Sequence, residues 1–158
     1  MMRTGGPAGG GRGHARAASV VLFAAVSLVT AGAGCSSGPS SSAGSRVVVT
    51  EHDFGLQASV SSVRAGAVTV HVVNRGPSTH ELNIDRTSMA DGSLPLKPDG
   101  LTVNEDSSAL QRVDSVSVVR LGASQDLHLR LEPGHYVLYC NLEGHYLGTM
   151  HASLEVTA

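Results

Sequence analysis

A thiol, an imidazole and a thioether lie close together near the end of this 158-residue chain. Cys140 is followed by His145 after four residues, and Met150 follows after four more. Thiolate and thioether are soft ligands that favour copper(I), and imidazole also binds copper. Two imidazoles, one thiolate and a weak axial thioether form the site of electron-transfer copper proteins. The C-x4-H-x4-M spacing therefore indicates a mononuclear copper site in a loop, with Gly144 and Gly148 easing its turns.

Such a site needs a second histidine from elsewhere in the chain. His80 is the best candidate, because it follows the turn Asn74-Arg75-Gly76-Pro77 and so lies where a loop re-enters a sheet. A sandwich can place that loop beside the one before the last strand, since both lie at one end. Another of the eight histidines could serve instead.

Five other histidines are expected to be structural. His71 and His128 fall at the polar phase of alternating segments and should face solvent, and His52 lies in a charged run beside the first strand. His135 follows a Pro-Gly turn at a strand entrance, and His151 should point away from its neighbour Met150, because successive strand residues alternate.

Taken singly, Cys140 would be a small buried hydrophobe and Met150 a core residue. Their common spacing with His145 favours a metal site over both interpretations. The rival chemistry is a nucleophilic Cys-His pair, which needs a base, an orienting third group and access for a substrate. The sequence contains no protease signature, and a thioether has no role in that chemistry.

The elements that must position these residues are short strands. Seven segments show apolar alternation or β-branched runs and are separated by Gly, Pro and Asn turns. They cover residues 47–49, 68–73, 80–84, 115–121, 127–131, 135–140 and 150–156. Seven or eight such strands over about 110 residues predict an all-β, antiparallel β-sandwich.

The stretch between Arg86 and Asp114 lacks alternation and contains Pro95, Pro98 and several aspartates. It is expected to be a surface excursion, with one short helix starting near Asn104.

The first 34 residues read as an export signal, and not as part of the folded domain. Basic residues without acidic ones precede a short apolar run, which falls short of the roughly 20 residues that a spanning helix needs. Cys35 and a Ser/Gly linker to residue 45 then resemble a bacterial lipoprotein signal with Cys35 lipidated. Ala31-Gly32-Ala33 could instead be a small-residue cleavage site. Either route exports the domain, residues 46–158, to the cell envelope, the periplasm or the medium.

Composition narrows the function classes. The 11 basic and 13 acidic residues nearly balance, and no basic stretch is available to neutralise phosphates, so nucleic acid is not an expected partner. Only Cys35 and Cys140 are present, which excludes a disulfide scaffold in the domain.

Two motifs resemble those of a known family, the cupredoxins, which are plastocyanin- and azurin-like blue copper proteins. Val68 to Asp85, with the core Asn74-Arg75-Gly76-Pro77-Ser78-Thr79-His80-Glu81-Leu82, is similar to their first-ligand region. Pro133 to Cys140, continuing through Gly144-His145 to Met150, is similar to their C-terminal copper loop. The loop spacing is closest to the rusticyanin and sulfocyanin types.

The resemblance implies a Greek-key β-sandwich that holds one type 1 copper ion per chain. It implies His80 and His145 as imidazole ligands, Cys140 as the thiolate and Met150 as the axial ligand. It also implies a monomer that carries electrons between transient redox partners and catalyses no reaction. Glu81 departs from the pattern, because some members have an asparagine there that bonds to the cysteine sulfur, and an ionised carboxylate cannot donate that bond.

Two rival functions remain open. One is copper storage or delivery, although a closed set of four ligands favours retention of the metal. The other is a metal-free interaction domain on the envelope. Multicopper oxidases, copper nitrite reductases and binuclear centres need more cysteines, more histidine sets or a second domain than the chain offers.

Overall fold

A computed structural model of the chain describes residues 44–158. Nine strands and one turn of 3-10 helix make up its regular structure. The elements are β1 (Ser45–His52), β2 (Gly55–Ala58), β3 (Ser62–Arg64), β4 (Gly66–Asn74), β5 (His80–Arg86), η1 (Asp91–Ser93), β6 (Gln111–Val119), β7 (Ser124–Leu131), β8 (Gly134–Tyr139) and β9 (His151–Thr157).

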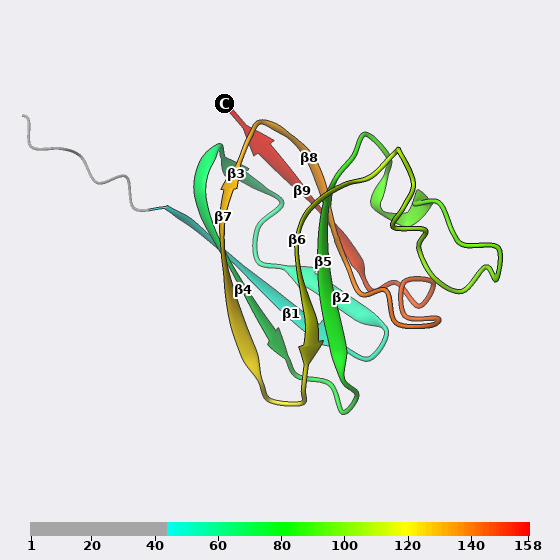
Figure 1. Cartoon of the computed structure of the whole chain (residues 1–158). Helices are drawn as coiled ribbons and strands as arrows, with labels where there is room; N and C mark the ends of the chain where they lie inside the picture. Colours follow the sequence, from blue (N-terminus) through cyan, green and yellow to red (C-terminus); the bar gives the residue numbers. More distant parts are fainter. Residues whose placement is uncertain (1–43) are drawn as a thin grey trace, which may run out of the picture. The chain divides into compact units, whose positions relative to one another are not determined.

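The strands form two sheets that pack face to face (Figure 1). One sheet has the order β2-β1-β4-β7, and the other has the order β3-β9-β8-β5-β6. The main buried cluster takes aliphatic side chains from both sheets, such as Val49 and Val70 from the first and Ile84 and Leu138 from the second. The predicted all-β sandwich is therefore confirmed.

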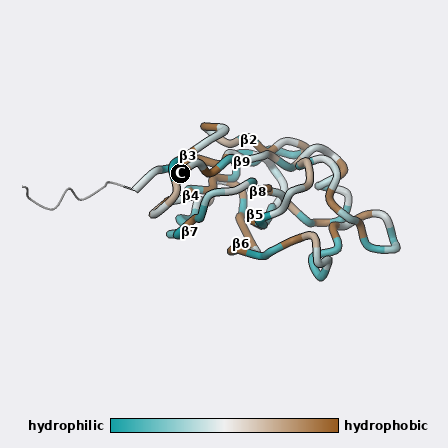
Figure 2. Tube along the Cα trace, turned by 90° about the horizontal axis from the view of Figure 1, so that it is seen from above, coloured by the Kyte–Doolittle hydropathy of each residue, from teal (hydrophilic) through white to brown (hydrophobic). Residues whose placement is uncertain are grey.

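Side-chain alternation explains why these segments become strands. Along β4 the inward positions Val68, Val70 and Val72 are buried, whereas the residues between them are partly exposed. Figure 2 shows hydrophobic positions recurring between hydrophilic ones along the strands. β8 differs because both of its faces are covered. Tyr136 and Leu138 belong to the main core, and the alternate residues Val137 and Tyr139 belong to a second buried cluster.

Two details of the predicted sheet arrangement are wrong. The structure has nine strands where seven or eight were expected, because β2 and β3 are only 4 and 3 residues long and too short to show alternation. The sheets are also not wholly antiparallel, since β1 pairs in parallel with β4 and β3 with β9. Parallel partners that are distant in sequence leave no local signal in the chain.

The excursion, defined here as residues 87–110 between β5 and β6, also differs from expectation. The predicted helix near Asn104 is wrong, because residues 104–110 form successive turns and the one helical turn is η1. The excursion is not a free surface loop either. Its Leu94 and Val103 are buried against Val137 and Tyr139 of β8, in the second cluster. The excursion thus covers the outer face of the second sheet.

The predicted export signal, the linker up to residue 43 and the lipidation site Cys35 lie outside the described residues. Within residues 44–158, no helix has the length and apolar character needed to cross a membrane.

One buried side chain breaks the apolar pattern of the core. Glu51 continues the inward phase of Val47 and Val49 on β1 and is completely buried. Neither of its carboxyl oxygens has a hydrogen-bond partner among residues 44–158. Burial, helped by the negative charge of Glu81, raises the pKa of Glu51 to about 8. The folded domain therefore keeps this carboxyl protonated at neutral pH.

We predict that Glu51 makes the metal-free domain less stable as pH rises. The native state retains the Glu51 proton up to about pH 8, whereas an unfolded chain loses it near pH 4.5. The protonated Glu51 carboxyl contributes its whole stabilisation below the unfolded-state pKa of 4.5. This contribution is lost as pH rises through the native-state pKa of about 8, by at most about 1.4 kcal/mol per pH unit. Urea unfolding of Glu51→Gln at a series of pH values should show a flatter dependence than the wild type.

Glu132→Gln is the matched control, because Glu132 is exposed on the turn after β7. This variant should keep the wild-type slope. If Glu51→Gln and Glu132→Gln have the same pH dependence of unfolding, Glu51 is ionised in the native core and the prediction is wrong.

Candidate metal centre

The pairing of β5 with β8 brings His80 and Cys140 to the same end of the sandwich. Asn83 lies opposite Tyr139 in this antiparallel pair, so Leu82 is level with the position of Cys140. His80 precedes Leu82 by two residues and therefore points to the same inner face. Both His80 and Cys140 are completely buried.

His145 completes a compact group with these two residues. Each of the three offers one ligand atom, and the three atoms lie within 4.8 Å of one another. Nδ1 of His80 is 3.3 Å from Nδ1 of His145, and Sγ of Cys140 is 3.5 Å from the same nitrogen. The structure thus brings together three of the four predicted ligands, one of them from sixty residues earlier in the chain than Cys140.

Met150 lies at the other end of the ligand loop, defined as residues 140–150 between β8 and β9. The Cys140 amide donates to the Met150 carbonyl at 3.0 Å, and the Met150 amide donates to the His145 carbonyl at 3.2 Å. Met150 is completely buried in the main core cluster, together with Cys140. The chain turns at Gly144, whose φ of +79° favours glycine.

Asn74 fixes the loop that precedes His80. Its side-chain amide donates to the carbonyls of Ser78 and Val119, both at 2.7 Å, and its side-chain oxygen accepts from the Gly76 amide at 2.8 Å. A buried asparagine with all of these partners makes one loop conformation strongly preferred. The turn before His80, which the sequence indicated, is therefore fixed by Asn74 at the end of β4.

Asp53, in the turn after β1, lies beside the His80 ring. Its Oδ1 lies 3.2 Å from Nε2 of His80, without the alignment of a hydrogen bond. The Ser78 amide donates to Oδ1 of Asp53, and the Ser78 hydroxyl donates to Oδ2. The Ser78 hydroxyl in particular lowers the pKa of Asp53. An ionised carboxylate beside Nε2 favours the tautomer with the proton on that nitrogen, which leaves Nδ1 free to bind a metal.

The pKa shifts of His80 and Cys140 favour their uncharged forms. Burial lowers the pKa of His80, and a charge on His145 would act in the same direction, whereas Asp53 opposes both. Burial raises the pKa of the Cys140 thiol to about 11, although backbone amides of Glu81 and Leu142 donate toward the sulfur and reduce the effect. The Glu81 carboxylate does not donate to this sulfur; its Oε1 accepts from the Asn83 side chain at 3.0 Å and from the Asn141 amide at 3.1 Å.

The turn between β1 and β2 packs over the ligand loop. The ring of Phe54 lies 6.0 Å from the His145 ring, and the Thr149 hydroxyl donates to the Phe54 carbonyl at 3.0 Å. Phe54 and Thr149 are the two non-glycine residues with positive φ in the described part of the chain. A side chain at Gly148 would lie 2.3 Å from the Phe54 ring, so this close approach requires glycine.

The geometry of the group fits a single metal ion. Nitrogen and sulfur atoms held about 2.0–2.3 Å from one ion lie roughly 3.3–3.6 Å apart at tetrahedral angles. The observed separations of 3.3 and 3.5 Å fall in this range. The donor set of two imidazoles and a thiolate, with a buried thioether at the end of the same loop, is suited to copper.

The other histidines of the described region do not join this group. His52 and His128 are exposed, as expected, whereas His71 is only partly exposed and lies 2.7 Å from Asp126. His135 contacts Glu155, and His151 lies 3.4 Å from Asp91.

Comparison with solved structures shows that the fold is that of the cupredoxins. Reduced auracyanin from Roseiflexus castenholzii is similar with a TM-score of 0.54 and 19% identity, over 72% of this chain and 98% of that one. Reduced rusticyanin has a TM-score of 0.52 and 15% identity, over 72% and 81% of the two chains. Auracyanin B has a TM-score of 0.51 and 21% identity, over 72% and 89%. No family model and no curated protein sequence matches the chain.

We predict that metal binding displaces the Cys140 proton. A thiol with a pKa of about 11 is protonated in the metal-free protein at pH 8, whereas a metal ion binds the thiolate. The apparent affinity for zinc(II), a redox-inert probe, should therefore rise about tenfold per pH unit between about pH 8 and pH 9.5. Competition titration against a chelator, corrected for the chelator's own protonation, measures this slope.

Cys140→Ser serves as the control, since a hydroxyl does not ionise in this range and the slope should disappear. An affinity of the wild type that does not change with pH would mean that the thiol is already ionised without metal, contrary to the prediction.

Proposed function

We propose that this chain is a cupredoxin in function as well as in fold, an exported carrier of single electrons with one type 1 copper ion. The observation that supports this most directly is the convergence of His80 Nδ1, His145 Nδ1 and Cys140 Sγ at separations suited to one ion. Met150 would be the axial ligand. The solved auracyanin and rusticyanin with similar folds are described in reduced form, which fits redox proteins.

The one-electron chemistry would come from the bound copper, and the chain would supply its surroundings. His80 and Cys140 would hold the ion in a site closed to water, and Asp53 would keep the His80 ring in one orientation. His145 is partly exposed and would provide the edge through which electrons enter and leave. Buried, fixed ligands would also favour retention of copper over its storage and delivery.

Apolar side chains around His145 would form a docking rim. Phe54 is 65% exposed beside the His145 ring, and Leu147 on the ligand loop is 51% exposed. Leu101 of the excursion, whose carbonyl accepts from the Gly144 amide, extends this surface. A small apolar surface suits the weak, brief encounters of an electron carrier with its partners.

The sequence supports a place outside the cytoplasm. A basic, apolar and small-residue leader followed by Cys35 is typical of an exported protein, and lipidation of Cys35 would anchor it to the envelope. We propose that the domain works there as a monomer with transient redox partners.

The copper-loaded, oxidised protein should absorb strongly near the red end of the visible spectrum. This band is charge transfer from the Cys140 thiolate, so Cys140→Ser should lose it, whereas Met150→Leu should keep it and change the reduction potential. Optical and EPR spectra with redox titration measure both. A colourless complex would support copper storage, and no copper binding at all would support a metal-free interaction domain.

Leu147→Glu should slow electron self-exchange between two copies of the protein by about tenfold or more, because each encounter would then bring like charges together at the docking rim. The spectrum and the potential should not change. Val60→Glu is the control: Val60 is 41% exposed and precedes β3, which pairs with the end of β9 farthest from the ligand loop. Equal self-exchange rates in the two variants would exclude docking at this rim.

A further inference from the structure

The excursion has no role in the proposed function so far, yet it contacts the ligand loop along much of its length. Figure 1 shows the two segments on the same side of the sandwich, next to the end of β8. Three residues of the ligand loop hydrogen-bond to the excursion, and each is the neighbour in sequence of a proposed copper ligand. They are Asn141, Gly144 and Tyr146.

Every polar atom of the Asn141 side chain forms a hydrogen bond with the excursion. Its Oδ1 accepts from the Val103 amide at 2.5 Å, and its Nδ2 donates to the Val103 carbonyl at 3.1 Å and to Glu105 at 2.9 Å. The side chain therefore pairs with the backbone of Val103 much as a neighbouring strand would. This contact fixes the residue directly after Cys140.

Tyr146 anchors the loop on the other side of His145. Its hydroxyl accepts from the Leu94 amide at 2.8 Å and donates to the Asp91 carbonyl at 2.6 Å. Its ring is buried in the second cluster and meets Tyr139 edge to face, with ring centroids 6.0 Å apart. Between the two anchors, the Gly144 amide donates to the Leu101 carbonyl at 3.1 Å.

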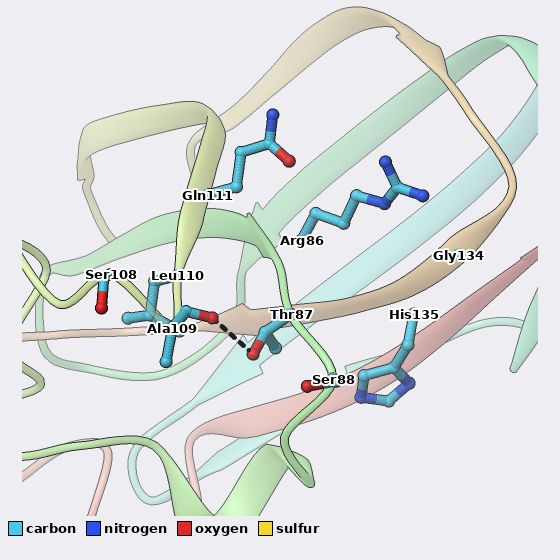
Figure 3. Close-up of a pocket in the computed structure, with 9 residues that line it drawn as sticks. All are labelled: Arg86, Thr87, Ser88, Ser108, Ala109, Leu110, Gln111, Gly134 and His135. Carbon is cyan, nitrogen blue, oxygen red and sulfur yellow. Dashed lines mark hydrogen bonds between the residues drawn. The ribbon is translucent and has the colours of Figure 1, made fainter.

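The excursion can hold the loop because it is itself ordered. Leu96 and Val103 form an antiparallel bridge, and the Lys97 amide donates to the Thr102 carbonyl at 2.9 Å. At its base, the Thr87 hydroxyl donates to the Ala109 carbonyl at 2.8 Å and ties its two ends together (Figure 3). The pocket of about 440 Å³ at this base lies at the start of β8, at the opposite end of that strand from Cys140.

We propose that the excursion is a clamp for the ligand loop, with Asn141 and Tyr146 as its positioning residues. They bind no metal themselves. They keep Cys140 and His145 in the same place whether or not the metal is bound and in either of its charge states. The inference rests on the proposed function for the identity of the metal, but the hydrogen bonds that carry it are independent of copper.

Two variants test the clamp, and a third is the control. Tyr146→Phe keeps the buried ring and removes two hydrogen bonds, and Asn141→Ala removes three. Tyr136→Phe keeps a buried ring and removes one hydrogen bond, to the Glu132 carbonyl, at the end of β8 away from the ligand loop and outside the excursion. The first measurement is amide hydrogen exchange in the metal-free protein, at Gly148 and Met150 of the loop compared with Val70 of the core.

In both clamp variants, exchange at Gly148 and Met150 should become about tenfold faster relative to Val70, as expected for the loss of hydrogen bonds that hold a loop closed. Copper transfer from the loaded protein to a chelator should become about tenfold faster as well. Tyr136→Phe should match the wild type in both measurements.

An unchanged ratio of loop to core exchange in both clamp variants would overturn the clamp, because the contacts would then contribute only to global stability. So would a Tyr136→Phe variant that loosens the loop as much as they do. A wild type that binds no copper would instead contradict the proposed function, and the exchange measurement would still decide whether the clamp exists.

Discussion

The nitrogens of two imidazoles lie 3.3 Å apart, the Cys140 sulfur lies 3.5 Å from one of them, and the rest of this end of the molecule depends on that arrangement. Charges this close together would be unfavourable, and burial favours the uncharged forms of two of these groups, because it raises the pKa of the Cys140 thiol and lowers that of His80. A metal ion that displaces the thiol proton would bind the thiolate and the nearby imidazole nitrogens together.

The surrounding fold holds these atoms from four directions. The register of β5 with β8 sets the position of His80 against Cys140, and the Asp53 carboxylate lies beside the His80 ring. The turn that carries Phe54 covers the ligand loop from the first sheet. The excursion contacts it from the outer face of the second sheet. β8 takes part in both clusters. Its inward-facing positions lead to Cys140 in the main core, and its outward-facing positions end at Tyr139 in the second cluster.

Local patterns carried much of this information in the sequence. Every segment in which alternation predicted a strand is a strand, because apolar alternation directly reflects burial on one face. Cys140 and His145 could be recognised as a group because they share one loop, and His80 because a turn of distinctive composition precedes it. The short strands β2 and β3 were missed, since a segment of 3 or 4 residues holds too few positions to show a period.

What the sequence did not reveal depends on contacts between distant residues. Asp53 stood in a charged run that looked like surface, yet it lies against His80 through the turn after β1. The prolines and aspartates of the excursion concealed Leu94 and Val103, which are buried only because β8 offers its outer face. Asn141 and Tyr146 had no recognisable role, because their partners lie some forty to fifty residues earlier in the chain.

The central claim is that one copper ion binds both imidazoles and the thiolate at once. X-ray absorption at the copper edge, on protein loaded with one equivalent of copper, tests it most directly. The account predicts one short sulfur neighbour and two imidazole nitrogens in both the oxidised and the reduced protein, with nearly the same distances in the two states. A first shell of nitrogen and oxygen alone, or loss of the sulfur neighbour on oxidation, would contradict it.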